Sequence, residues 1–138
     1  TIKRLNWPPE IIHIHGWIAA LLPLYLKQIY KDEPIFQKSK IITSIYGNEF
    51  DKKLNKNMIN KILFDEVDEK YISELGNPSY ENLMKVAIDS SDAIIKGSEN
   101  ISGEINDYLK KYKNPVLEFQ SPDSFSEPYM DFYNKLLS

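Results

Sequence analysis

The chain contains no cysteine, which excludes disulfides, thiolate nucleophiles and cysteine-ligated zinc. This composition fits a reducing compartment, and we expect a cytoplasmic protein. No apolar run approaches the roughly 20 residues of a membrane span, because the longest, from Trp17 to Leu26, contains a proline and is followed by Lys27. The net charge of −3 offers no cationic field for nucleic acid phosphates. The sequence therefore predicts neither a membrane protein nor a nucleic-acid-binding one.

Several catalytic and phosphate-binding motifs are also missing. The five glycines are isolated from one another, so no phosphate loop of the Walker or dinucleotide type is present. No Gly-x-Ser-x-Gly elbow or recognisable triad indicates a serine nucleophile. We therefore predict no catalytic residue from the sequence alone.

Histidine is almost absent as well, since His13 and His15 are the only two. They lie two residues apart on one face of a predicted strand, and no third ligand at a metal-binding spacing accompanies them, so no metal site is predicted. We expect His13, deep in the strand, to be a hydrogen-bonded core residue. His15, at the strand end, is equally compatible with a ligand-facing and a structural role.

The residues that are present predict one α/β domain over 1–138, with a Rossmann-like parallel sheet and helices on both faces. Hydrophobic residues make up 42% of the 138, as in soluble globular domains. Predicted strands cover 10–15, 40–46, 92–96 and, more weakly, 115–119; predicted helices cover 17–30, 80–88, 101–112 and 125–136. The strands are apolar rather than alternating in polarity, and they alternate with helices, which is typical of a parallel sheet. Four strands are few for such a sheet, so we expect one or more strands upstream of Thr1.

Some local features of these elements can also be predicted. Pro23 should bend the helix over 17–30 or lie near its first turn. Ser124 and Glu127 have the spacing of a capping box before the last helix. The charged segment 49–76 includes a possible helix over 57–64 and paired carboxylates at 65–66 and 68–69, which we interpret as a solvated surface.

The strand exits are the candidate ligand sites, because ligands of open α/β sheets bind outside the carboxyl ends of the strands. These exits are residues 15–17, 46–48, 96–98 and 119–121. Each carries a small or polar residue that leaves the backbone accessible. Taken singly, each is better explained by ordinary turn chemistry.

One segment resembles a known family. Residues 9–27, PEIIHIHGWIAALLPLYLK, resemble the PDVVHxHDW-x-A-A-L-x-P-x-Y-L-K segment of bacterial glycogen synthases and plant starch synthases. Residues 40–46 are similar to the next strand of that family, which ends in Thr-x-His-Asn where this chain has Ser44-Ile-Tyr-Gly47. Residues 81–95 and 101–105 are similar to a following helix, strand and helix start. The matches cover most of residues 8–110 in the same order.

The resemblance implies a GT-B glycosyltransferase, in which two Rossmann-like domains face a cleft and glucose passes from ADP-glucose to the end of an α-1,4-glucan. This chain would be the second half of the N-terminal, acceptor-side domain, without the nucleotide-binding domain and with no cofactor beyond the donor ADP-glucose. The implied substrate-binding residues are His15, Gly16, Trp17, Tyr46, Gly47 and Asn48.

Departures from the family pattern also carry expectations. Gly16 stands in place of an aspartate, Tyr46 of a histidine and Gly47 of an asparagine, so polar groups that would orient sugar hydroxyls are lost. We therefore expect the isolated chain to bind α-glucan rather than elongate it. The leading function that the resemblance implies is synthase-type glucosyl transfer in glycogen metabolism, to which this chain contributes the glucan-acceptor wall. The alternatives are a non-catalytic glucan-binding or regulatory module and a structural remnant without a ligand; a homo-oligomer is a further expectation.

The last predicted helix, within residues 124–137, resembles the helix that returns to the N-terminal domain at the end of these enzymes. This resemblance implies that the nucleotide domain is deleted between Phe119 and Ser124. The plain alternative is an ordinary last helix of the α/β series. The two differ in whether the helix lies across residues 17–30 or only beside its own strand.

Overall fold

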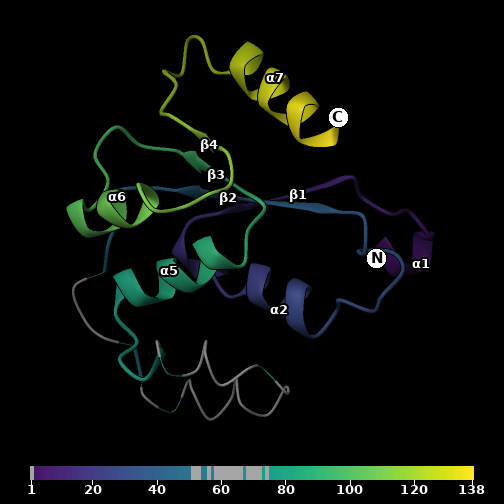
Figure 1. Ribbon diagram of the computed structural model, residues 1–138, viewed down its shortest axis with the longest axis horizontal. Coiled ribbons are helices and arrows are strands. Elements are labelled where there is room, and N and C mark those ends of the chain that lie inside the picture. Colours follow the sequence, from purple (N-terminus) through teal and green to yellow (C-terminus); the bar gives the residue numbers. More distant parts are fainter. Residues whose placement is uncertain (1, 51–53, 56, 58–66, 68–72, 74) are drawn as a thin grey trace.

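The computed structural model describes residues 2–50, 54, 55, 57, 67, 73 and 75–138. The grey trace in Figure 1 marks the remainder. The helix predicted over 57–64 and the paired carboxylates at 65–66 and 68–69 lie almost wholly outside the described residues.

Four strands form one parallel sheet in the order β1-β2-β3-β4 (Figure 1). They are β1 (Ile11–His15), β2 (Lys40–Ile45), β3 (Ala93–Lys96) and β4 (Val116–Leu117). Isoleucine-rich segments favour these strands because β-branched side chains pack well on a pleated surface. The residues of β2 from Ile41 to Ile45 are all buried, as expected for a central strand covered on both faces. The four predicted strands are confirmed, although β4 is shorter than predicted.

Among the described residues, three α-helices cover one face of the sheet: α2 (Leu22–Gln28), α5 (Tyr80–Asp89) and α6 (Gly103–Leu109) (Figure 1). Each lies in the connection between two neighbouring parallel strands, and such crossovers are almost always right-handed. Because the strand order follows the sequence, this constant hand places the three helices on the same face. Their apolar side chains pack with Ile45 and Ile94 of the sheet in the larger core.

The segment predicted as one helix over 17–30 is divided in two. A short 3-10 helix η1 (Trp17–Ala19) precedes α2, and Pro23 lies in the first turn of α2. Proline suits that position because a first-turn backbone N–H would have no helical partner. Pro23 thus marks the beginning of α2 and does not bend a longer helix. A further short helix, α1 (Ile2–Leu5), was not predicted from the sequence.

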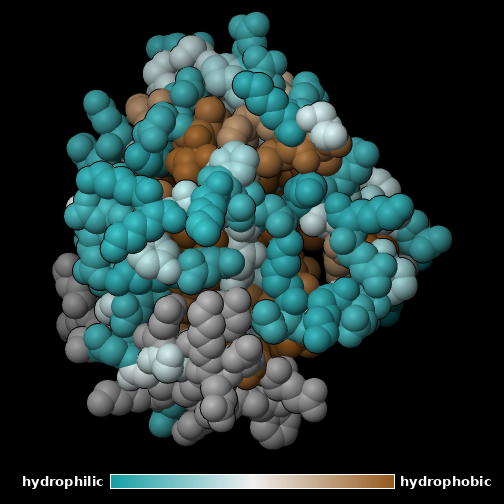
Figure 2. All heavy atoms as spheres, in the orientation of Figure 1, coloured by the Kyte–Doolittle hydropathy of each residue, from teal (hydrophilic) through white to brown (hydrophobic). Residues whose placement is uncertain are grey.

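The last helix, α7 (Ser126–Leu137), covers the opposite face of the sheet (Figure 1). Phe132 is its buried residue and packs with Ile42, Ala93 and Ile95. The same cluster includes Ile11 of β1 and Leu117 of β4, so α7 spans the sheet rather than lying beside its own strand or across residues 17–30. Figure 2 shows apolar side chains gathered where α7 meets the sheet. Helices on both faces, as predicted, complete the Rossmann-like α/β arrangement.

The predicted capping box before α7 is wrong. The residue preceding the helix is Phe125, and no side chain caps it. The Ser124 hydroxyl instead bonds the Ser121 hydroxyl at 2.9 Å, inside a turn closed by Ser124 N–H to Ser121 O. Pro128 in the first turn carries no N–H, so one donor that a cap would satisfy is already absent.

Asp92 connects three elements at the amino ends of the strands. Its two carboxylate oxygens each accept a hydrogen bond from Lys27 Nζ at 2.8 Å, and one of them also accepts the backbone N–H of Ile41 at 2.8 Å. The carboxylate therefore joins α2 to β2 at the point where β3 begins.

Among the described residues, the helices are all too short or too polar to cross a membrane.

Candidate ligand-binding groove

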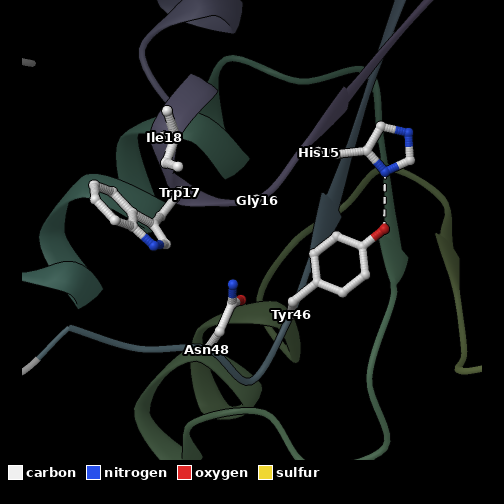
Figure 3. A pocket seen from close by; sticks show the side chains of 6 residues that line it. All are labelled: His15, Gly16, Trp17, Ile18, Tyr46 and Asn48. Atoms are coloured by element: carbon white, nitrogen blue, oxygen red, sulfur yellow. Dashed lines mark hydrogen bonds between the residues drawn. The ribbon is translucent and has the colours of Figure 1, made fainter.

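The exits of β1 and β2 open on a pocket of about 300 Å³. It is lined by His15, Gly16, Trp17, Ile18, Tyr46 and Asn48. Figure 3 shows Trp17 and Ile18 on one side of this first pocket, His15 and Tyr46 on the other, and Asn48 between them. Five of the six predicted binding residues therefore meet here.

A second pocket, of about 410 Å³, lies beside the first at the exits of β2 and β3. It is lined by Tyr46, Gly47, Asn48, Ser98, Glu99 and Asn100. Tyr46 and Asn48 line both pockets, so the two form one groove along the carboxyl edge of the sheet. Gly47, the sixth predicted residue, belongs to the second pocket.

Four groove residues are not among the six predicted binding residues: Ile18, Ser98, Glu99 and Asn100. Of these, Ser98 lies within a strand exit that the sequence marked as a candidate ligand site. Ile18 is 85% exposed at the rim, next to the predicted Trp17. The other three follow β3, whose exit at residues 96–98 the parallel-sheet rule had already marked. That rule could have extended the site to the third exit, because consecutive parallel strands end at the same edge.

Gly16 gives the first exit its shape. Its φ of 69° lies in the left-handed region that favours glycine, and its N–H donates to Ser44 O at 3.0 Å. The chain can therefore leave β1 sharply and present Trp17 to the pocket. Trp17 is then held by Phe50, whose ring centroid lies 4.8 Å away, and Phe50 packs edge-on against Tyr80.

Two glycines leave room for close contacts around the second pocket. A Cβ added at Gly47 would lie 2.2 Å from the backbone oxygen of Asn100. A Cβ added at Gly97 would lie 2.5–2.8 Å from three ring carbons of Tyr46. The loop after β3 and the ring of Tyr46 can occupy their observed places because these two positions lack side chains.

Tyr46 is held at both ends. Its hydroxyl bonds His15 Nδ1 at 2.8 Å, and its backbone oxygen accepts the Tyr80 hydroxyl, also at 2.8 Å (Figure 3 shows the first of these bonds). Burial, with smaller contributions from Glu49 and Glu81, raises the pKa of Tyr80 to about 12. The Tyr80 hydroxyl therefore stays protonated and able to donate at neutral pH. These contacts make the Tyr46 ring a fixed wall between the pockets.

His13 lies behind this wall and away from the groove. Its Nδ1 bonds the Tyr133 hydroxyl and its Nε2 the Ser44 hydroxyl, each at 2.7 Å. Burial, and then the neighbouring His15, lowers the pKa of His13 to about 4, so the ring is neutral at pH 7. The hydrogen bonds predicted for His13 are present, whereas its side chain is half-buried rather than part of the core. His15 stacks on His13 with ring centroids 4.1 Å apart and also lines the first pocket.

The groove offers aromatic surfaces and uncharged hydrogen-bonding groups. Within the described part of the chain, no side-chain hydrogen bond occupies Asn48, Ser98, Glu99 or Asn100. Its described lining residues include one carboxylate, that of Glu99, and no lysine or arginine. Among the described residues, no three side chains of metal-binding types come together. The arrangement suits a neutral ligand rich in hydroxyls better than an anion.

Comparison with known proteins identifies the family. The family described as the starch synthase catalytic domain matches residues 1–114. The chain belongs to the glycogen and starch synthase family. The matched stretch contains all residues of both pockets and ends before α7.

Curated relatives of this glycogen and starch synthase family agree. The chain is 33% identical to the glycogen synthase of Chlorobium phaeovibrioides over 106 residues, which are 76% of this chain and 21% of that protein. It is 30% identical to the glycogen synthase of Thermotoga petrophila over 138 aligned positions, covering 90% of this chain and 26% of that protein. The chain thus spans about a quarter of the length of these relatives. No solved structure matches it significantly.

Proposed function

We propose that this chain forms the glucan-acceptor side of a glycogen or starch synthase cleft and binds an α-1,4-glucan along its groove. The family is that of enzymes acting with ADP-glucose as glucosyl donor, and a GT-B arrangement and a cytoplasmic location are part of this proposal. The observation that carries it is the pair of adjoining pockets that share the Tyr46 wall.

The chemistry of the groove favours the acceptor over the donor. The rings of Trp17 and Tyr46 provide flat surfaces on which the apolar faces of glucosyl units can stack. The amides of Asn48 and Asn100 and the carboxylate of Glu99 provide donors and acceptors for sugar hydroxyls. A nucleotide diphosphate would need cationic groups, and no lysine or arginine among the described residues lines either pocket. The two pockets in a row suit successive units of a chain.

The second candidate is a non-catalytic glucan-binding or regulatory module. The hydrogen bond between the Tyr46 hydroxyl and His15 favours this candidate, because it engages a polar group that could otherwise bind a ligand. Both candidates require glucan binding and differ in glucosyl transfer. An assay with ADP-glucose and glycogen separates them, and we expect no transfer by the isolated chain; measurable transfer would contradict that expectation.

Titration with maltoheptaose at millimolar concentration, followed by NMR, tests the shared requirement. We expect shifts confined to the residues of the two pockets. Asn48→Ala should weaken binding about twofold to tenfold, since one neutral hydrogen bond contributes roughly 0.5–1.5 kcal/mol. Asn134→Ala, at an exposed position of α7, is the matched control and should bind as the wild type does. No shift in the wild-type chain would refute the glucan proposal.

A further inference from the structure

A continuous set of side-chain contacts runs from α7 to the groove. The Tyr133 hydroxyl bonds His13 Nδ1 at 2.7 Å, and the His13 ring stacks on His15 at 4.1 Å between centroids. His15 Nδ1 then bonds the Tyr46 hydroxyl at 2.8 Å. Tyr133 and His13 line neither pocket. The four side chains come from α7, from β1 and from the exit of β2, so distant parts of the sequence meet in one row.

Each ring in this row has its orientation defined by more than one contact. Tyr133 and Ser44 bond opposite nitrogens of His13, which leaves the ring little freedom to rotate about χ2. Neutral His13 has one donor and one acceptor nitrogen, and hydroxyls can match either tautomer. His15 is exposed on its outer side, so its orientation depends on the His13 face and the Tyr46 hydroxyl.

Tyr46, at the groove end of the row, is restrained in both its backbone and its ring. Its backbone is fixed by Tyr80, and its ring lies against Gly97. What remains adjustable is the hydroxyl end of the ring, and that end bonds His15. A change at His13 therefore reaches the wall shared by the two pockets through one intervening ring.

We propose that Tyr133 of α7 and His13 of β1 are positioning residues, which set the orientation of the Tyr46 ring through His15. The packing of α7 on the sheet thus determines the shape of the groove at the carboxyl edge of the sheet. The consequence for ligand affinity rests on the proposed function; the consequence for the Tyr46 ring does not.

Tyr133→Phe tests the proposal, because it removes one oxygen and keeps the ring that packs on the sheet. Tyr129→Phe is the matched control: the residue lies one turn away on α7, its ring is 6.4 Å from His13, and no hydrogen bond of its hydroxyl occurs among the described residues. Since the chain has two histidines, its imidazole NMR signals are two sets, which a single His15→Gln spectrum assigns.

We expect Tyr133→Phe to move the signals of His15 and of the Tyr46 ring further than Tyr129→Phe does, although no hydrogen bond or ring contact among the described residues joins Tyr133 to either. Ser44→Ala removes the other partner of His13 from the sheet side and should move the same signals. Maltoheptaose binding should weaken about twofold to tenfold in Tyr133→Phe, the range that corresponds to one lost neutral hydrogen bond.

His15 and Tyr46 signals that move no further in Tyr133→Phe than in Tyr129→Phe would overturn the proposal. Unchanged maltoheptaose affinity in Tyr133→Phe would overturn it too, provided that the wild-type chain binds. If the wild type binds no maltoheptaose, the glucan proposal fails and the NMR comparison still decides whether Tyr133 positions Tyr46.

Discussion

Position 97 lies directly against the ring of Tyr46, so a side chain there meets the wall between the two pockets. In Gly97→Ala, the new Cβ would lie 2.5–2.8 Å from ring carbons, closer than atoms can approach without displacement. We expect the ring to shift and the free energy of unfolding to fall by about 1–3 kcal/mol, as in other overpacked sites. Urea unfolding measures the stability, and the maltoheptaose titration measures the groove.

Gly103→Ala is the control for this variant. No atom lies within 4 Å of a Cβ added there, and the residue begins α6. Its stability should stay equal to that of the wild type or rise by up to about 1 kcal/mol, since alanine restricts the unfolded chain. Equal behaviour of the two alanine variants would contradict the close contact at Gly97.

His13 makes stability depend on pH. Burial and then His15 lower its pKa from 6.5 to about 4, so the folded state binds fewer protons than the unfolded state between these values. The stability that this difference contributes is complete above pH 6.5 and is lost as the pH falls toward 4. Because His13 is only half-buried, solvent screening makes this contribution smaller than the full shift in pKa would give.

We therefore expect the unfolding free energy of the wild type to fall more steeply between pH 7 and pH 4 than that of His13→Gln. Urea unfolding at several pH values in this range measures both slopes. Carboxylates titrate in both proteins, so their contribution cancels in the difference. Parallel slopes would show that His13 is protonated as readily in the folded protein as in the unfolded chain.

At the scale of single residues, the sequence predicted which residues line the groove better than it predicted which residues bond one another. Five of the six proposed binding residues line the first pocket, because strand exits converge whatever the side chains are. The hydrogen bonding of His13 was also predicted. Its bond to Tyr133 was not, since the two are separated by 120 positions and no local pattern connects them.

At the scale of elements, Asp92 joins α2, β2 and β3 through one carboxylate. Asp92→Ala leaves the Ile41 N–H without its acceptor, which should lower the unfolding free energy by about 1–3 kcal/mol. Lys27→Ala removes only a partly exposed ion pair, with a contribution of at most about 1 kcal/mol. Urea unfolding of both variants compares the two contributions. Equal losses of unfolding free energy in the two variants would show that Asp92 stabilises the fold through its ion pair with Lys27 and not through its bond to the Ile41 N–H.

Element types followed from composition, whereas element boundaries depended on backbone donors. Apolar isoleucine runs and helical periodicity predicted the strands and the helices α5, α6 and α7. The division between η1 and α2 depends on Pro23, which has no backbone N–H and therefore fits only the first turn of α2. The capping box failed because the Ser124 hydroxyl had a nearer partner in Ser121, and spacing alone does not show such competition.

For the molecule as a whole, one face of the sheet depends on α7. Phe132→Ala should lower the unfolding free energy by about 3–5 kcal/mol, because Phe132 is 8% exposed and packs on Ile42 and Ile95. Met130, on the same helix, is 57% exposed, so Met130→Ala should change it by less than about 0.5 kcal/mol. Thermal or urea unfolding compares them.

Removing residues after Ser121 extends this prediction. The cut exposes the whole apolar face and should lower stability by several kcal/mol, a large share of the roughly 5–15 kcal/mol of a typical domain. An unchanged melting temperature would show that the face needs no cover. Because α7 lies neither across residues 17–30 nor only beside β4, its position does not distinguish the two origins suggested for it, and the deletion between Phe119 and Ser124 stays a prediction.

The contact between Tyr46 and Gly97 also restricts the order in which sequence changes could accumulate. A tyrosine at position 46 keeps its observed orientation only where position 97 is glycine, because a Cβ there would displace its ring at a cost in stability. The reverse order is open, since a glycine at 97 harms no smaller side chain at 46. In an alignment of relatives, we therefore expect glycine at 97 with or without tyrosine at 46, and tyrosine at 46 rarely without glycine at 97.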